Sequence, residues 1–323
     1  MMVLPAWLTG MLAAAAAVAA PVKEELLVWH DPARDSREVP VKAYLPEKVE
    51  GPLPIILFSH GLGGSREAAP FLGRAWAAAG FMCFHLEHEK SNTRALLRAG
   101  GRAGAKSLAS APAAIDRVRD VKFALDELTR LNCDPKSEFA GKLDLSRIGI
   151  AGHSFGAQTS MAMIGTRSFS PGGTALSAAD PRIQAALVLS PSGTPYRNYG
   201  EKAYETITVP VLFMTGTDDY SPINEATPAE RRLPFEHCRN SERTLITFAG
   251  GDHMIFAGRS DRPAGKSFRG DAVYHVLIAE LSLRFWQAYL KNDPEALKFI
   301  RSQTAMKQAV GDNAEVEIGE KSK

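Results

Sequence analysis

The residue types needed for acyl transfer occur in one order along this chain: a serine, then a carboxylate, then a histidine. Ser154 stands in the segment Gly-His-Ser-Phe-Gly at 152–156, which fits the G-x-S-x-G pattern. This pattern places a serine on a sharp turn between a strand and a helix, where its hydroxyl is exposed. The flanks agree, because 148–151 is a short apolar run and 157–165 is rich in alanine and methionine. Ser154 is the candidate nucleophile.

A serine nucleophile needs a general base, and the candidates are the histidines that follow it. These are His237, His253 and His275. His253 comes directly after the predicted last strand, 243–248, where a loop can present it above the sheet edge. His237 precedes that strand, and His275 falls within a predicted helix, 268–291. We therefore predict His253 as the base and interpret His153, beside the nucleophile, as structural.

The base needs an acid that orients it, expected at the end of a strand between Ser154 and His253. The predicted strand 209–215 continues into Gly-Thr-Asp-Asp at 216–219, so Asp218 and Asp219 both fit. Asp219, three residues after this glycine, is the favoured acid. Asp252 is adjacent to the base in sequence, so its side chain should diverge from the imidazole.

Backbone amides that could stabilise an oxyanion form the fourth element. The predicted strand 54–59 runs into His-Gly-Leu-Gly-Gly at 60–64. In sites of this kind one donor follows the nucleophile and the other comes from the loop after such a strand. These donors are the N–H groups of Phe155 and Leu62. Each such donor is worth roughly 3 kcal/mol in transition-state stabilisation.

Strands that alternate with helices must position these residues. Predicted strands are 24–29, 39–45, 54–59, 81–86, 148–151, 183–190, 209–215 and 243–248, and predicted helices are 68–80, 112–132, 157–165 and 268–291. Buried strands with helical crossovers predict an α/β fold with a mostly parallel twisted sheet of about eight strands and helices on both faces. No large lid domain is expected, because 191–208 is short and contains no amphipathic helix.

The two ends of the chain differ in character from its middle. Residues 4–20 are uncharged and alanine-rich and end in a small-x-small pattern, which predicts a signal peptide over 1–19 and export to the periplasm or medium. The n-region lacks lysine and arginine, so an uncleaved anchor or a misplaced start remains the alternative. A catalytic domain is expected over 20–300 and a polar, loosely held tail over 301–323.

Composition narrows the function classes. The chain has 323 residues, is 45% hydrophobic and 23% charged, and carries a net charge of +2, so nucleic acid is not a favoured partner. After the N-terminal segment no apolar run is long enough for stable membrane insertion. Cys133 and Cys238 could pair in an oxidising compartment, whereas Cys83 lies in an apolar run. Histidines and glutamates at 85–89 are poorly placed for a compact zinc site, so no metal or other cofactor is predicted.

These motifs resemble those of the α/β-hydrolase superfamily, and more closely those of bacterial proteins grouped with platelet-activating-factor acetylhydrolase and predicted dienelactone hydrolases. The likeness rests on the segments 58–64, 152–156, 216–219 and 251–253. It differs at two points: dienelactone hydrolases use cysteine where this chain has Ser154, and the animal acetylhydrolases take their acid after the preceding strand, where this chain has Ser-Pro-Ser at 190–192.

The expected function is hydrolysis of small carboxylic esters through an acyl-Ser154 intermediate, with short acyl chains preferred because no lid encloses a long one. Lipase, thioesterase, peptidase or polyester hydrolase activity on the same triad is the alternative among enzymes. A non-catalytic binding protein of the same fold would require loss of a triad member, and none is missing. The sequence leaves the oligomeric state open.

Overall fold

One large sheet organises the protein. The structure is a computed structural model that describes residues 20–169, 174–192, 200–223, 225–258 and 271–321. Within these ranges, nine strands form a sheet in the order β1-β2-β4-β3-β5-β8-β9-β10-β11. The six strands from β4 to β10 pair in parallel, and antiparallel strands close both edges. The predicted mostly parallel α/β sheet is confirmed. The predicted signal peptide, 1–19, lies outside the described residues.

The described strands of the main sheet are β1 (Val22–Asp31), β2 (Arg37–Pro46), β3 (Leu53–Ser59), β4 (Met82–Leu86), β5 (Leu143–His153), β8 (Ile183–Leu189), β9 (Val211–Asp218), β10 (Arg243–Asp252) and β11 (Ala314–Gly319). A separate small hairpin pairs β6 (Ser168–Phe169) with β7 (Ala175–Leu176). The α-helices are α2 (Pro70–Ala78), α3 (Thr93–Arg98), α4 (Ala105–Leu108), α5 (Ala111–Cys133), α6 (Phe155–Ile164), α7 (Leu233–His237), α8 (Asp271–Leu290), α9 (Pro294–Ile300) and α10 (Gln303–Val310).

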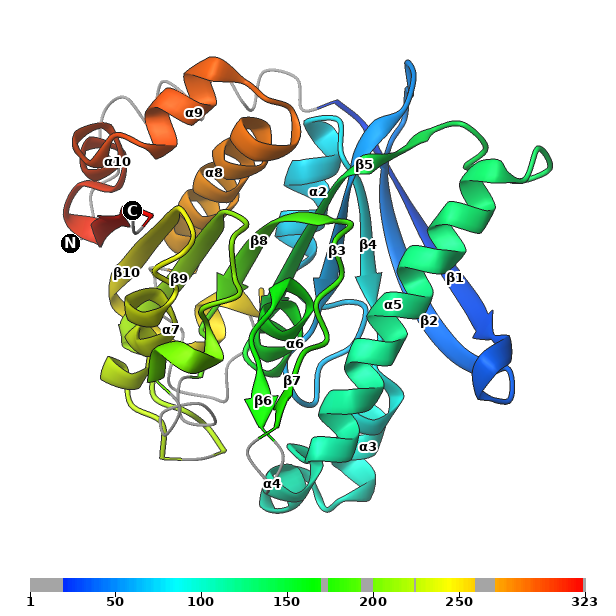
Figure 1. Ribbon diagram of the computed structural model, residues 1–323, viewed down its shortest axis with the longest axis horizontal. Helices are drawn as coiled ribbons and strands as arrows, with labels where there is room; N and C mark the ends of the chain where they lie inside the picture. The colour runs from blue at the N-terminus through cyan, green and yellow to red at the C-terminus, as the bar shows by residue number, and fades with distance from the viewer. Residues whose placement is uncertain (1–19, 170–173, 193–199, 224, 259–270, 322–323) are drawn as a thin grey trace.

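Alternating side chains of the central strands build a core on each side of the sheet. In β3, Ile56 and Phe58 belong to one cluster, whereas Ile55 and Leu57 belong to the other, because successive side chains in a strand point to opposite faces. Helices α2 and α8 cover the first face, and α5 and α6 cover the second, as Figure 1 shows. A strand covered on both faces has no polar side to alternate with, which explains the continuous apolar runs.

The C-terminal segment departs from its prediction as a loosely held tail. It forms α10 and β11, and β11 adds an antiparallel edge strand to β10. Val316 is only 1% exposed and packs in the core with Val310 and Met306. The strand alternates apolar and acidic residues, so one face is buried while the acidic side chains remain more accessible. Glu315 and its neighbours made the segment look like a polar tail.

Two further expectations need correction or stay open. All three cysteines are free: Cys133 is exposed at the end of α5, whereas Cys238 is fully buried after α7, so the suggested pairing is wrong. The segment on which the absence of a lid depends, 191–208, includes 193–199, which lie outside the described residues, and that expectation stays a prediction. Among the described helices, none is long and apolar enough to cross a membrane.

Candidate active site

Ser154 occupies a strained turn between β5 and α6. Its backbone has φ 56° and ψ −113°, in a region that non-glycine residues rarely adopt. Such a conformation costs on the order of 1–3 kcal/mol and persists only where surrounding structure enforces it. The Ser154 amide donates to the Leu189 carbonyl of the neighbouring strand β8 at 2.9 Å, which anchors the turn. The hydroxyl is consequently held at the tip of the turn, as the G-x-S-x-G pattern predicts.

The glycines on either side of Ser154 allow backbones to approach where a side chain could not fit. A Cβ at Gly152 would lie 2.2 Å from the carbonyl oxygen of Gly156. A Cβ at Gly156 would lie 1.9 Å from the carbonyl oxygen of Ser59 at the end of β3. Both contacts are with backbone atoms, so neither can be relieved by a side-chain rotation. Gly152 therefore allows the turn to close tightly on the start of α6, and Gly156 allows α6 to pack against the end of β3.

The structure brings Ser154, His253 and Asp219 together in one hydrogen-bonded chain. The Nε2 atom of His253 lies 3.0 Å from Ser154 Oγ. Its Nδ1 atom lies 2.7 Å from Asp219 Oδ1. With the proton on Nδ1, the imidazole donates to the carboxylate and leaves Nε2 free to accept from the serine hydroxyl. This is the geometry of a nucleophile, its base and the acid that orients the base.

Asp219 and Asp218 end up in different environments. Asp219 is fully buried, whereas Asp218 is exposed at the end of β9. Burial raises the pKa of the Asp219 carboxyl, but the hydrogen bond from His253 and the charge of Arg231 outweigh it and lower that pKa from 3.8 to about 2. Asp219 is therefore ionised at neutral pH and available to accept the Nδ1 proton, in line with its choice over Asp218.

Sequence reasoning missed the residues that surround Asp219. Thr215 Oγ1 donates to Oδ2 at 2.9 Å, and Ser190 Oγ donates to Oδ1 at 2.9 Å. Ser190 Oγ also lies 2.8 Å from His253 Nδ1, and the Arg231 guanidinium lies 3.3 Å from the carboxylate. Ser190 and Thr215 could have been suspected from their positions at or near the carboxyl ends of β8 and β9. Arg231 has no comparable local signal.

The remaining histidines serve packing or support. His153 is buried, its pKa is lowered to about 3 by burial, and its Nε2 atom lies 3.0 Å from the backbone carbonyl of His253. His153, which is interpreted from the sequence as structural, thus supports the backbone of the candidate base His253. His237 stacks on Tyr204, and the ring of His275 lies 4.2 Å from that of Phe71.

Of the two residues predicted to supply oxyanion donors, Leu62 lines the same cavity as Ser154, and Phe155 follows Ser154 directly in the chain. Phe155 is the first residue of α6, and an N–H group in the first turn of a helix has no intrahelical acceptor. In the described part of the chain, no backbone carbonyl accepts from the Leu62 amide either. The cavity has a volume of about 230 Å³ and is lined by Leu62, Ser154 and His253 together with apolar side chains. These apolar residues include Leu96, Ile223 and Met254.

The histidines at 85–89 are committed to protein contacts. His85 Nδ1 lies 3.0 Å from the carbonyl of Ala68, and His88 contacts Asp120 and Ser59. Within the described residues, no group of three or more metal-type ligands is placed to hold an ion.

Comparisons with known proteins match both halves of this site. A family model described as PET hydrolase-like matches residues 106–268, which include Ser154, Asp219 and His253. A second, described as platelet-activating factor acetylhydrolase, isoform II, matches residues 22–98, which include Leu62. The platelet-activating factor acetylhydrolase of Cavia porcellus is 28% identical over 298 residues, covering 80% of this chain and 62% of the relative. The chain thus spans less than two thirds of that relative's length.

Proposed function

The chain belongs to the PET hydrolase-like family of serine ester hydrolases in the α/β-hydrolase superfamily, and we propose that it hydrolyses small carboxylic esters through an acyl-Ser154 intermediate. The observation that carries this proposal is the chain of hydrogen bonds from Ser154 through His253 to Asp219, at a cavity that Leu62 also lines. No metal or other cofactor is needed for this chemistry.

The first half of the reaction forms the acyl-enzyme. His253 Nε2, 3.0 Å from Ser154 Oγ, takes the hydroxyl proton as the oxygen attacks the ester carbonyl. Asp219 holds the Nδ1 proton and stabilises the imidazolium that forms. The N–H groups of Leu62 and Phe155 donate to the carbonyl oxygen as it becomes negative. His253 then protonates the departing alcohol, and the acyl group stays on Ser154.

In the second half of the reaction, the same groups hydrolyse the acyl-enzyme and release the carboxylic acid product. Water enters beside the acyl group, and His253 removes its proton as it attacks the carbonyl carbon. The oxyanion again forms opposite Leu62 and Phe155, and its collapse returns the proton from His253 to Ser154 Oγ. One base therefore serves both steps, which is why its tautomer must be fixed throughout.

The cavity supports a short acyl group. Its volume of about 230 Å³ is below the roughly 300–1,000 Å³ of pockets that enclose drug-sized ligands. A long acyl chain outside the cavity would lose roughly 0.8 kcal/mol for each methylene that burial would otherwise stabilise. Soluble short-chain esters are therefore the first substrate class.

Polyester cleavage is the second candidate, and the family match over residues 106–268 favours it. A polymer can be cleaved at an open site without being enclosed. Polyester hydrolases of the cutinase type place a tryptophan after the strand that corresponds to β8, the first main-sheet strand after the nucleophile. In this chain no tryptophan occurs between Ser190 and Pro210. Soluble esters are therefore ranked first.

A panel of nitrophenyl esters from acetyl to palmitoyl, assayed beside a polyester film, tests both rankings. The fastest turnover should occur with the shortest chains, and pretreatment with a fluorophosphonate should abolish it. Activity that rises steadily toward palmitoyl would refute the short-chain preference. Hydrolysis of the film with little turnover of the soluble esters would reverse the order of the two candidates.

A further inference from the structure

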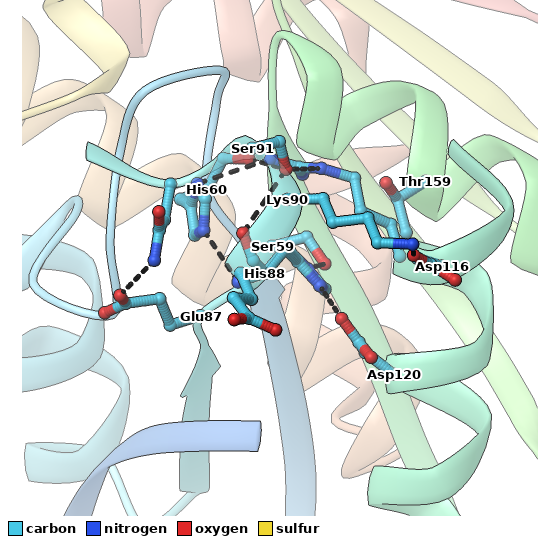
Figure 2. Close-up of polar contacts among 12 residues, drawn as sticks. Ser59, His60, Glu87, His88, Lys90, Ser91, Asp116, Asp120 and Thr159 are labelled. Atoms are coloured by element: carbon cyan, nitrogen blue, oxygen red, sulfur yellow. Dashed lines mark hydrogen bonds and ion pairs between the residues drawn. The ribbon is translucent and has the colours of Figure 1, made fainter. Parts of the chain in front are cut away.

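A buried polar cluster contacts the loop at 60–64, which carries the Leu62 amide and is called the oxyanion loop below. Its members come from the ends of β3 and β4, the turn at 89–91 and helix α5. Figure 2 shows Ser59, His60, Ser91 and Asp120 of this cluster, each joined to His88 by a hydrogen bond. His88 bonds Asp120 at 2.9 Å and Ser59 at 3.1 Å, which repeats the residue types of the candidate triad. All three are at most 1% exposed, so they cannot meet a substrate, and any effect of the cluster on catalysis has to pass through the loop that it contacts.

Arg117 of α5 is the charged member of this cluster that reaches the loop itself. Its side chain is fully buried. Asp120 pairs instead with Arg34, Arg37 and His88, and in the described part of the chain no carboxylate forms an ion pair with Arg117. Burial lowers the pKa of Arg117 to about 9, so the guanidinium remains charged at neutral pH. A buried charge without an ion pair is costly, and here it is offset by hydrogen bonds from the fixed fork of donors that a guanidinium provides.

The fork of Arg117 fixes the backbone that carries the Leu62 amide. Nη1 donates to the His60 carbonyl at 2.7 Å, and Nε donates to Ser91 Oγ at 2.8 Å. The backbone carbonyl of Ser91 in turn accepts from the Gly63 amide at 2.8 Å, on the far side of Leu62. Arg117 thus holds the loop on both flanks of the donor, directly at His60 and through Ser91 beyond it.

His60 extends this control to the peptide plane of the donor. The His88 amide donates to His60 Nε2 at 3.0 Å, so the His60 proton sits on Nδ1 and is donated to the Gly61 carbonyl at 2.6 Å. The Gly61 carbonyl and the Leu62 N–H are opposite ends of one planar peptide. A donor fixed on the carbonyl therefore aims the N–H toward the cavity, and it also polarises the peptide in the sense that strengthens that N–H as a donor.

The same guanidinium also contacts the side chain of Phe155, the residue that carries the second donor. The Arg117 Cζ atom lies 4.4 Å from the centre of the Phe155 ring, which is cation–π distance. Phe155 follows the nucleophile and carries the other candidate N–H. One buried side chain therefore touches both segments that supply the oxyanion donors, although these segments lie far apart in the sequence.

We propose that Arg117 is a positioning residue that holds the N–H groups of Leu62 and Phe155 in the single arrangement that fits an oxyanion. This proposal rests on the ester-hydrolase function proposed above. Lysine keeps the charge but cannot span the His60 carbonyl and Ser91 and stack on Phe155 at once. A small misalignment of such donors affects the transition state more than the bound ester, so the effect belongs in kcat and not in KM.

The test compares Arg117→Lys with a control variant, Arg119→Lys. Arg119 lies two residues further along the same helix and is exposed. We expect Arg117→Lys to lower kcat on a soluble nitrophenyl ester by roughly ten- to hundredfold, with KM within about threefold. Affinity for an alkyl boronic acid, which forms a tetrahedral adduct on Ser154, should fall by a similar factor, and Arg119→Lys should match wild type. A kcat within about threefold of wild type, or a change confined to KM, would overturn the proposal.

A folding failure of Arg117→Lys leaves a second route. Ser91→Ala removes one acceptor of the fork and a longer hydrogen bond of 3.4 Å to the His88 carbonyl, and it should lower kcat by roughly three- to tenfold at unchanged KM. An unchanged kcat in that variant would overturn the proposal. If the wild-type protein cleaves no ester, the proposed ester-hydrolase function itself is wrong. If the wild type is active and Arg117→Lys is equally active, only the role of Arg117 is rejected.

Discussion

Asp219→Asn tests how the candidate base is oriented. In the wild type, Asp219 Oδ1 accepts from His253 at 2.7 Å and from Ser190 at 2.9 Å, while Oδ2 accepts from Thr215 at 2.9 Å. An asparagine has only one oxygen, so its NH₂ group must face one of these donors. If the NH₂ group faces Nδ1, the imidazole proton moves to Nε2, and the nitrogen beside Ser154 can no longer accept the hydroxyl proton.

The expected loss in kcat is about 10⁴-fold, or about 5.5 kcal/mol in the activation barrier. Asp219→Asn should also lower the free energy of unfolding, by a smaller amount than it raises the activation barrier. The pKa of Asp219 is lowered from 3.8 to about 2 in the folded protein, which corresponds to about 2 kcal/mol of stabilisation. Because the folded-state pKa is the lower one, this stabilisation is present above pH 3.8 and is lost as the pH falls toward 2.

The measurements are kcat on a soluble nitrophenyl ester at neutral pH and the free energy of unfolding by denaturant between pH 6 and pH 2. Asp218→Asn is the matched control, since Asp218 is adjacent but exposed, and it should retain activity within about twofold. The stability difference between wild type and Asp219→Asn should narrow on acidification. A reversed ranking of the two variants would move the acid to Asp218. Loss of less than about tenfold from Asp219→Asn would refute the tautomer argument.

Three further outcomes are expected. Ser154→Ala should keep the fold by circular dichroism but lose about 10⁶ in kcat, and more than about a hundredth of wild-type turnover would exclude Ser154 as the nucleophile. Leu62→Pro, which deletes the N–H, should cripple turnover, whereas Leu62→Met should be nearly silent; similar losses in both would indicate side-chain packing instead of backbone donation. Val316→Ala should lower the free energy of unfolding by about 2 kcal/mol because Val316 is 1% exposed, whereas Glu315→Ala should be neutral; equal effects would mean that β11 is loosely held.

The fold and the candidate triad were predictable because their signals are local. Buried parallel strands appear as continuous apolar runs, and the carboxyl ends of such strands meet at one edge of the sheet. Once Ser154 was placed at a strand-to-helix turn, chain order and strand ends left few choices for its partners. β11 was missed because an edge strand buries only one face, and its glutamates resemble the composition of a tail.

Contacts between distant segments left no such signal. Arg231 reaches Asp219 from a turn that has no motif, and Arg117 lies 57 positions from the His60 carbonyl that it binds. On an amphipathic helix, an arginine is expected to face solvent, and only the packing of α5 against the oxyanion loop buries this one. Ser190 lies directly after β8, but a serine carries no charge and therefore gives no sequence signal of its contact with Asp219.

The most direct test of the acyl-Ser154 intermediate is to capture it. Wild-type protein mixed with a short-chain nitrophenyl ester should be quenched in acid during turnover, digested, and mapped by tandem mass spectrometry. Ester hydrolysis through this site predicts an acyl group on Ser154, with none on the same peptide from Ser154→Ala. An acyl group on another residue, or continued hydrolysis by Ser154→Ala with no acylated peptide, would contradict it.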